Sequence, residues 1–156
     1  MMRTMILLVT LVGLSCVAGC GDGLERFPTA KVSGRVVCKG EPVPYVRVIF
    51  EPIADGKSAN SGKAGRAEVQ ADGTFLLSTY GNEDGAVIGM HRVKVLAADD
   101  LKYPDFKCDC IVNDVNVIME VEVKDIPENS IMIELPEKGS KDANKKVIEE
   151  EPDDFD

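Results

Sequence analysis

The sequence predicts an all-β protein, a single antiparallel β-sandwich of about seven strands. Three observations lead to this prediction. Apolar and polar residues alternate with a period of two through most of residues 31–136. Glycine and proline separate the alternating segments, as in the turn Ala71-Asp72-Gly73, a strong hairpin signal. No segment shows a convincing helical repeat, so two packed sheets are the simplest way to bury these apolar faces.

The expected strands follow one another along the chain, and each has one apolar face. Gly-, Ser- and Asn-rich segments at 54–64 and Gly-punctuated residues at 81–89 are expected to be loops. The inward residues are expected to be Val32, Gly34, Val36 and Cys38; Val46, Val48 and Phe50; Ala67 and Val69; Phe75 and Leu77; His91, Val93, Val95 and Ala97; Val115, Val117, Met119, Val121 and Val123; and Ile131, Ile133 and Leu135.

The first nineteen residues have the pattern of a secretory signal peptide. One charge, Arg3, precedes an apolar run that is too short to span a membrane and ends in small residues. The sequence Val17-Ala18-Gly19-Cys20 matches the bacterial lipobox. This match implies thioether attachment of diacylglycerol to Cys20, cleavage before Cys20 and acylation of the new amino group. Several acyl chains would anchor the protein firmly, since one chain alone binds a membrane only marginally.

The chain divides into four expected segments. They are the lipoprotein signal peptide at 1–19, a lipidated tether at 20–30, the β-sandwich at 31–136 and a disordered acidic tail at 137–156. The tail has few large apolar side chains, so burial cannot offset its ordering entropy. Its acidic run 149–154 is an alternative docking peptide for a basic surface or a metal.

Charge and composition argue against several functions. Among 156 residues, 27 are Asp or Glu and 18 are Lys or Arg, a net charge of −9. Nucleic acid is therefore not an expected partner, because phosphate binding needs a basic surface. One His and three Tyr leave few groups for proton transfer. We therefore expect no catalytic residues and no cofactor.

Export would place Cys38, Cys108 and Cys110 in an oxidising compartment, which favours a disulfide. Cys38 can pair with either Cys108 or Cys110, whereas a bridge between Cys108 and Cys110 would be strained. Alternatively, these cysteines with Asp109 or His91 offer ligands to copper or zinc, or form a redox-active pair. A Cys-x-Cys motif with one distant His is a weak metal signal, so we predict no metal.

Other polar residues have simpler explanations than chemistry. His91 shares its face with Val93 and Val95, so we expect a partly buried histidine held by one hydrogen bond. The oxygen-rich loops 82–84 and 99–100 are weak calcium candidates, because neither has a recognised ligand spacing. Three tyrosines give only weak support to a sugar-binding platform, because they are scattered along the sequence: Tyr45, Tyr80 and Tyr103.

Several segments resemble small planctomycete lipoproteins that carry a transthyretin-like, or carboxypeptidase regulatory-like, domain. They are VSGRV, KGEPV and VRVIF within 32–50, ADGTFLLST at 71–79, GAVIGMHRVKV at 85–95, and the closing residues 121–123, 129 and 131–135. The resemblance implies a Greek-key sandwich of the prealbumin (transthyretin) type. His91 departs from the aromatic residue more common in that family, and 106–114 is longer and richer in cysteine. Related sandwiches serve as accessory, carbohydrate-contacting or adhesive modules, so the fold implies little about function.

We therefore expect a non-enzymatic lipoprotein of the cell envelope, exported and anchored at Cys20 to a bacterial membrane, on its periplasmic face or at the cell surface. Its sandwich would act as a binding or structural module for an envelope protein or polysaccharide. Two alternatives remain: a carbohydrate-binding module, or a metal- or thiol-handling protein that uses Cys38, Cys108 and Cys110.

Overall fold

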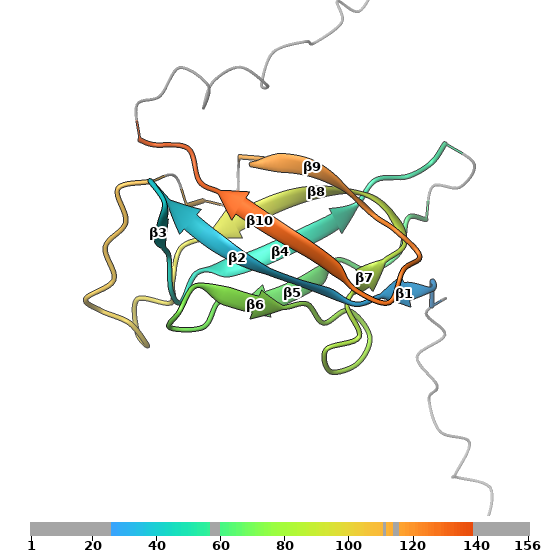
Figure 1. Cartoon of the computed structure of the whole chain (residues 1–156), viewed down its shortest axis with the longest axis horizontal. Coiled ribbons are helices and arrows are strands. Elements are labelled where there is room, and N and C mark those ends of the chain that lie inside the picture. Colours follow the sequence, from blue (N-terminus) through green and yellow to red (C-terminus); the bar gives the residue numbers. More distant parts are fainter. Residues whose placement is uncertain (1–25, 57–59, 111, 114–115, 139–156) are drawn as a thin grey trace, which may run out of the picture.

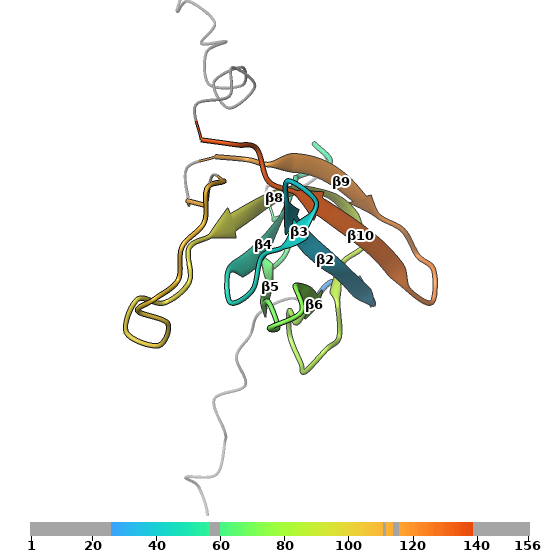
Figure 2. The same ribbon diagram turned by 60° about the vertical axis from the view of Figure 1, so that its left-hand side comes forward.

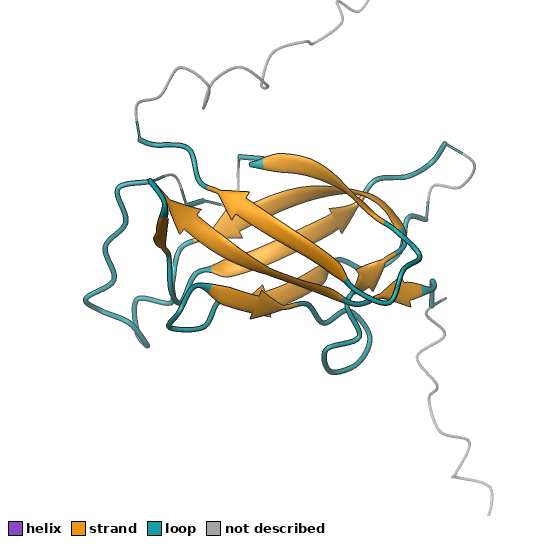
Figure 3. Cartoon of the chain, viewed as in Figure 1, coloured by secondary structure: helices purple, strands orange, loops and turns teal. Residues whose placement is uncertain are grey.

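The protein is described by a computed structural model over residues 26–56, 60–110, 112–113 and 116–138. These residues form strands and loops only, so the all-β prediction is confirmed (Figure 3). The predicted signal peptide and Cys20 lie outside the described residues. Nothing in the described part is a helix that could cross a membrane. The strands are β1 Thr29–Ala30, β2 Val32–Cys38, β3 Glu41–Pro42, β4 Arg47–Pro52, β5 Gly65–Glu68, β6 Thr74–Leu76, β7 Ala86–Val87, β8 Gly89–Leu96, β9 Met119–Val123 and β10 Asn129–Glu134.

Two four-stranded sheets pack as a sandwich (Figures 1 and 2). In one sheet β10 lies beside β2, with β6 paired to the beginning of β2 and β3 to its end. The other sheet has the order β5–β4–β8–β9, and β1 pairs separately with β7. A bridge between Arg66 and Ser78 connects the sheets where β5 passes the end of β6. Seven strands have three or more residues, in agreement with the predicted number.

The prediction of antiparallel pairing throughout is wrong for one pair. β10 runs parallel to β2, with Asn129 opposite Val32 and Glu134 opposite Val37. The reason is that β9 belongs to the other sheet, so residues 124–128 cross between sheets and do not close a hairpin. The Asn129 side chain holds this crossing: its Oδ1 accepts from the Lys124 N–H, and its Nδ2 donates to the Lys124 and Lys31 carbonyls.

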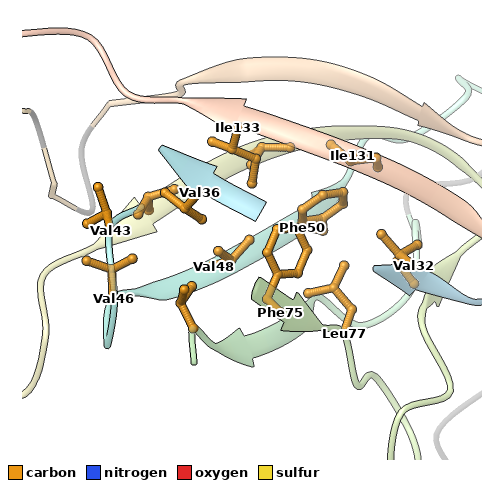
Figure 4. Close-up of a cluster of buried hydrophobic side chains, with 14 of the residues drawn as sticks. Val32, Val36, Val43, Val46, Val48, Phe50, Phe75, Leu77, Ile131 and Ile133 are labelled. Carbon is orange, nitrogen blue, oxygen red and sulfur yellow. The ribbon is translucent and has the colours of Figure 1, made fainter. Parts of the chain in front are cut away.

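The predicted apolar faces meet in one core between the sheets (Figure 4). Phe50 and Phe75 pack from opposite sheets, with ring centroids 6.4 Å apart. Gly34 leaves space for the Phe75 ring, since a Cβ there would lie 2.6 Å from the ring and 2.0 Å from the Ile131 carbonyl oxygen. One predicted position is wrong: Ala97 is exposed and Ala98 is buried, because β8 and its alternation end at Leu96. The predicted strand at 115–123 is shorter, since β9 begins at Met119, and Val115 lies outside the described residues.

The folded part extends beyond 31–136 at both ends. β1 lies within the predicted tether, where Thr29 and Ala30 pair with β7. At the other end, Glu137 forms an ion pair with Lys39 at 3.3 Å, and the Lys138 Nζ donates to the Cys108 carbonyl at 2.8 Å. Backbone pairing and these contacts order residues whose composition alone predicts a flexible segment. The remainder of the predicted tail, 139–156, lies outside the described residues.

Candidate functional site

The long loop after β8 carries the most distinctive surface of the described protein. This loop projects beyond one end of the sandwich (Figure 2). Tyr103 from the loop stacks on Tyr45, which precedes β4, with ring centroids 4.1 Å apart and planes 9° apart. Tyr45 has a φ of 65°, a left-handed conformation that is rare for a bulky residue. Such backbone strain is concentrated at functional positions, so we take this pair as the centre of the candidate site.

Glu68 on β5 fixes the position of Tyr103. Its Oε1 accepts hydrogen bonds from the Tyr103 hydroxyl, at 2.8 Å, and from the Lys102 Nζ. The Lys102 Nζ also lies 5.0 Å from the centroid of the Tyr103 ring. Hydrogen bonds from Lys102 and then Tyr103 lower the pKa of Glu68, and the bond to Glu68 raises the pKa of Lys102. The loop is therefore joined to the sheet by a charged cluster at neutral pH.

A groove of about 460 Å³ runs along the tyrosine pair. Its lining combines flat apolar groups with charged groups of both signs. The residues that line it are Pro44, Tyr45, Lys102, Tyr103, Pro104, Asp105, Phe106 and Lys107. Aromatic faces beside mixed hydrogen-bond donors and acceptors can bind a ligand that has both apolar and hydroxylated surfaces. We call this groove with its two stacked rings the tyrosine groove.

The sequence did not indicate that two tyrosines meet, because they lie far apart in the chain and only tertiary structure joins them. A weak local signal was present: Tyr45 follows Pro44 and Tyr103 precedes Pro104, so each ring sits on a rigid backbone. Tyr80 is not part of the groove. Its hydroxyl accepts from the Phe27 N–H at 3.2 Å, on another part of the surface.

A disulfide between Cys38 and Cys110 anchors the loop to the end of β2, with Cα atoms 6.0 Å apart. The sequence left two partners open for Cys38, and the structure pairs it with Cys110. Cys110 is fully buried and Cys108 is a half-buried free thiol. The Cys110 N–H donates to the Cys108 sulfur at 3.4 Å.

The structure separates the residues considered for metal binding. Two of the three cysteines are in the disulfide, and His91 lies in the core, where its ring is 5.9 Å from that of Phe50. Within the described part of the chain, no three His, Cys, Asp or Glu side chains form a metal-sized group. The His91 Nδ1 lies 3.0 Å from the Gly89 carbonyl, while its Nε2 is buried without a partner among the described residues.

In both loops that were weak calcium candidates, an aspartate carboxylate accepts hydrogen bonds from the backbone of its own loop. The Asp84 carboxylate accepts from the backbone N–H groups of Thr79, Tyr80 and Gly81, at 2.7 to 2.9 Å. Burial raises the pKa of Asp84, but these bonds outweigh burial and the pKa is lowered. The Asp99 carboxylate accepts from the Leu101 N–H and begins a turn. These carboxylates therefore organise their own loops.

Comparisons with known proteins find a structural similarity and assign no family. No family model matches the chain, and no curated protein matches it. The crystal structure of a DUF3823 family protein from Parabacteroides merdae is similar, with a TM-score of 0.42 and 18% identity. The match covers 71% of this chain and 47% of that protein, so the chain spans about half its length.

Proposed function

We propose that this protein is a lipid-anchored module of the bacterial cell envelope, without enzymatic activity. Its sandwich would belong to the transthyretin-like, or carboxypeptidase regulatory-like, kind that the sequence resembles in small planctomycete lipoproteins. The observation that carries the proposal is the disulfide between Cys38 and buried Cys110. A structural disulfide is typical of exported proteins and rare in the cytosol. It agrees with the predicted signal peptide at 1–19 and with the lipobox sequence that ends at Cys20.

The position of the single histidine supports a role without catalysis. A catalytic histidine needs a nucleophile or an orienting acid within hydrogen-bond reach. His91 faces the Gly89 carbonyl and the Phe50 ring, and it has no exposed surface. A binding or structural role fits this arrangement better than hydrolysis or isomerisation.

The mass of the protein extracted from native membranes tests the proposal. Free thiols are blocked before extraction, and the intact chain is then weighed. We expect a chain that begins at Cys20, carries added acyl mass, has one blocked thiol and holds no metal. The Cys20→Ser variant should keep residues 1–19 or leave the membrane fraction. A wild-type chain that retains Met1 to Gly19 without acyl mass would contradict the proposal.

The tyrosine groove favours a second candidate function, the binding of an envelope polysaccharide. A pyranose ring has an apolar face of C–H groups that packs on an aromatic ring, and its hydroxyls both donate and accept hydrogen bonds. The apolar lining around Tyr45 and Tyr103, which includes Pro44 and Phe106, offers the first kind of contact, and Lys107 and Asp105 at the rim offer the second. The groove mixes both charge signs, which suits a neutral glycan better than an anionic one.

Migration in gels that contain soluble polysaccharides tests this second function. A bound polysaccharide retards the wild-type protein, and Tyr103→Ala should weaken binding about tenfold, equal to about 1.4 kcal/mol. Tyr80→Ala is the matched control, since Tyr80 lies outside the groove. Lys107→Ala changes only an exposed residue at the rim of the groove. This variant replaces Tyr103→Ala as the test if Tyr103→Ala unfolds the loop. Equal retardation of Tyr103→Ala, Lys107→Ala and wild type would exclude the groove.

A further inference from the structure

Strand β10 is a long edge strand, and its outer side is open among the described residues. It pairs with β2 on one side, and no other described strand pairs with it (Figure 1). An edge of this kind presents unpaired N–H and C=O groups that can bind another strand.

The backbone hydrogen bonds between β10 and β2 identify which groups of β10 face outward. The Asn129 N–H donates to the Lys31 carbonyl at 2.8 Å, and the Leu135 N–H donates to the Val37 carbonyl at 2.9 Å. In a parallel pair, alternate residues of one strand face the partner strand. The backbone groups of Ser130, Met132 and Glu134 therefore point away from β2, toward the open edge.

The sandwich has two long edge strands that are open among the described residues, β9 and β10, and they differ in how well their side chains discourage pairing with another strand. On β9, the edge of the other sheet, Glu120 and Glu122 are both exposed, and such charges discourage pairing between edges. On β10 no charged residue precedes Glu134. Met132, in the middle of this strand, is 68% exposed. The β10 edge is therefore the one suited to association.

We propose that β10 pairs in an antiparallel manner with β10 of a second copy of this chain, with the two-fold axis at Met132. Met132 then faces Met132 of the second copy, and Ser130 faces Glu134. Each of these pairs can exchange two backbone hydrogen bonds, because their N–H and C=O groups point to the open edge. No carboxylate faces another carboxylate in this register, which matters for a chain of net charge −9. A two-fold contact of one surface with itself is the usual way to form a homodimer.

One strand pair makes a small contact. It buries less than the roughly 1,200 Å² typical of stable interfaces, so the dimer should dissociate readily in dilute solution. Confinement to a membrane raises the effective concentration of a second copy and favours the pair. This part of the inference rests on the proposed lipid anchor at Cys20, whereas the contact itself does not.

Site-directed cross-linking of the full chain, purified in detergent, tests the contact. Directly opposed residues of this type have Cα atoms about 5.5 Å apart, within the range that a disulfide spans. In a Cys108→Ser background, Met132→Cys should cross-link to a dimer under mild oxidation. Glu120→Cys on β9 is the control and should cross-link at least tenfold less. Equal cross-linking of the two variants would overturn the proposal.

Ser130→Pro, introduced into the Met132→Cys variant, tests the backbone pairing. Its N–H faces the open edge, so proline removes a bond of the dimer and none of the bonds to β2. We expect this variant to keep its thermal unfolding transition and to lose most of the Met132→Cys cross-link. Met132→Lys should lose the dimer that the wild-type chain shows in sedimentation at high protein concentration, and this variant is the second test if the proline variant unfolds. Persistence of the dimer in both folded variants would overturn the proposal. The acyl mass of the same sample is measured separately, so a missing anchor and a missing dimer give different results.

Discussion

The hydroxyl of Tyr103 donates a hydrogen bond to Glu68 Oε1 across 2.8 Å and so joins the loop after β8 to strand β5. Tyr103→Phe removes this bond and keeps the ring that stacks on Tyr45. We expect the pKa of Glu68 to rise and the free energy of unfolding to fall by about 0.5–1 kcal/mol, the lower part of the range for one hydrogen bond. Carboxyl chemical shifts of Glu68 followed by NMR against pH measure the pKa. The Lys102 bond should keep it below its usual value, and an unchanged pKa would exclude the Tyr103 bond.

The disulfide should contribute strongly to stability. It closes a loop with a sequence separation of 72 residues. On the chain-entropy model, removal of such a loop constraint costs about 4 kcal/mol. The double variant Cys38→Ala/Cys110→Ala should lose that amount in denaturant unfolding. Cys108→Ser is the matched control and should unfold as the wild type does. Loss of stability in the Cys108→Ser control would indicate that Cys108, and not Cys110, forms the bridge to Cys38.

The stability of the fold should decrease in mild acid because of His91. Burial lowers the pKa of this group below its ordinary 6.5, although the bond to the Gly89 carbonyl opposes the effect. Protons then bind the unfolded chain more tightly than the folded one, so stability is lost as the pH falls below 6.5. For one group, the free energy of unfolding cannot change by more than about 1.4 kcal/mol per pH unit.

Denaturant unfolding between pH 8 and pH 5 measures this dependence. Three carboxylates have a lowered pKa: Glu68, Asp72 and Asp84. The stability that they contribute is lost mainly below their ordinary pKa values, 4.5 for Glu68 and 3.8 for the two aspartates, so they add little in this range. His91→Leu should remove the slope. If the free energy of unfolding still decreases between pH 8 and pH 5 in this variant, another group causes the pH dependence.

The close packing at Gly34 predicts a large effect of a single methyl group. Gly34→Ala places a Cβ against the Ile131 carbonyl and the Phe75 ring, in a core that can yield little. Overpacking of this kind costs about 1–3 kcal/mol or more. Gly81→Ala is the control, since the nearest atom to its Cβ would be 3.6 Å away. Thermal unfolding of the two variants should differ clearly, and equal midpoints would contradict the packing described here.

Local pattern was sufficient to predict the strands that form the core. Val46, Val48 and Phe50, for example, are all fully buried, as their alternation indicates. The direction of β10 could not be predicted in this way, because an alternating segment carries no information about which neighbour it pairs with. Likewise, the cysteines predicted a disulfide, but two candidates only two residues apart left the choice of Cys108 or Cys110 to tertiary packing. The tyrosine groove joins residues 44–45 to residues 102–107, which are far apart in the chain, and the sequence therefore did not reveal it.

The pairing of β2 with β10 determines when this domain can fold. Strand β2 is the first long strand of the domain and β10 is the last. The two strands are hydrogen-bonded neighbours along six residue pairs. A chain that lacks β10 leaves the inward side of β2 without Ile131 and Ile133, so a stable core must await the last strand. Contacts between such distant segments make folding slow. A polypeptide with this topology cannot complete its core before β10 has been synthesised, and until then it remains in the unfolded condition in which a chain can be threaded through a narrow translocation channel.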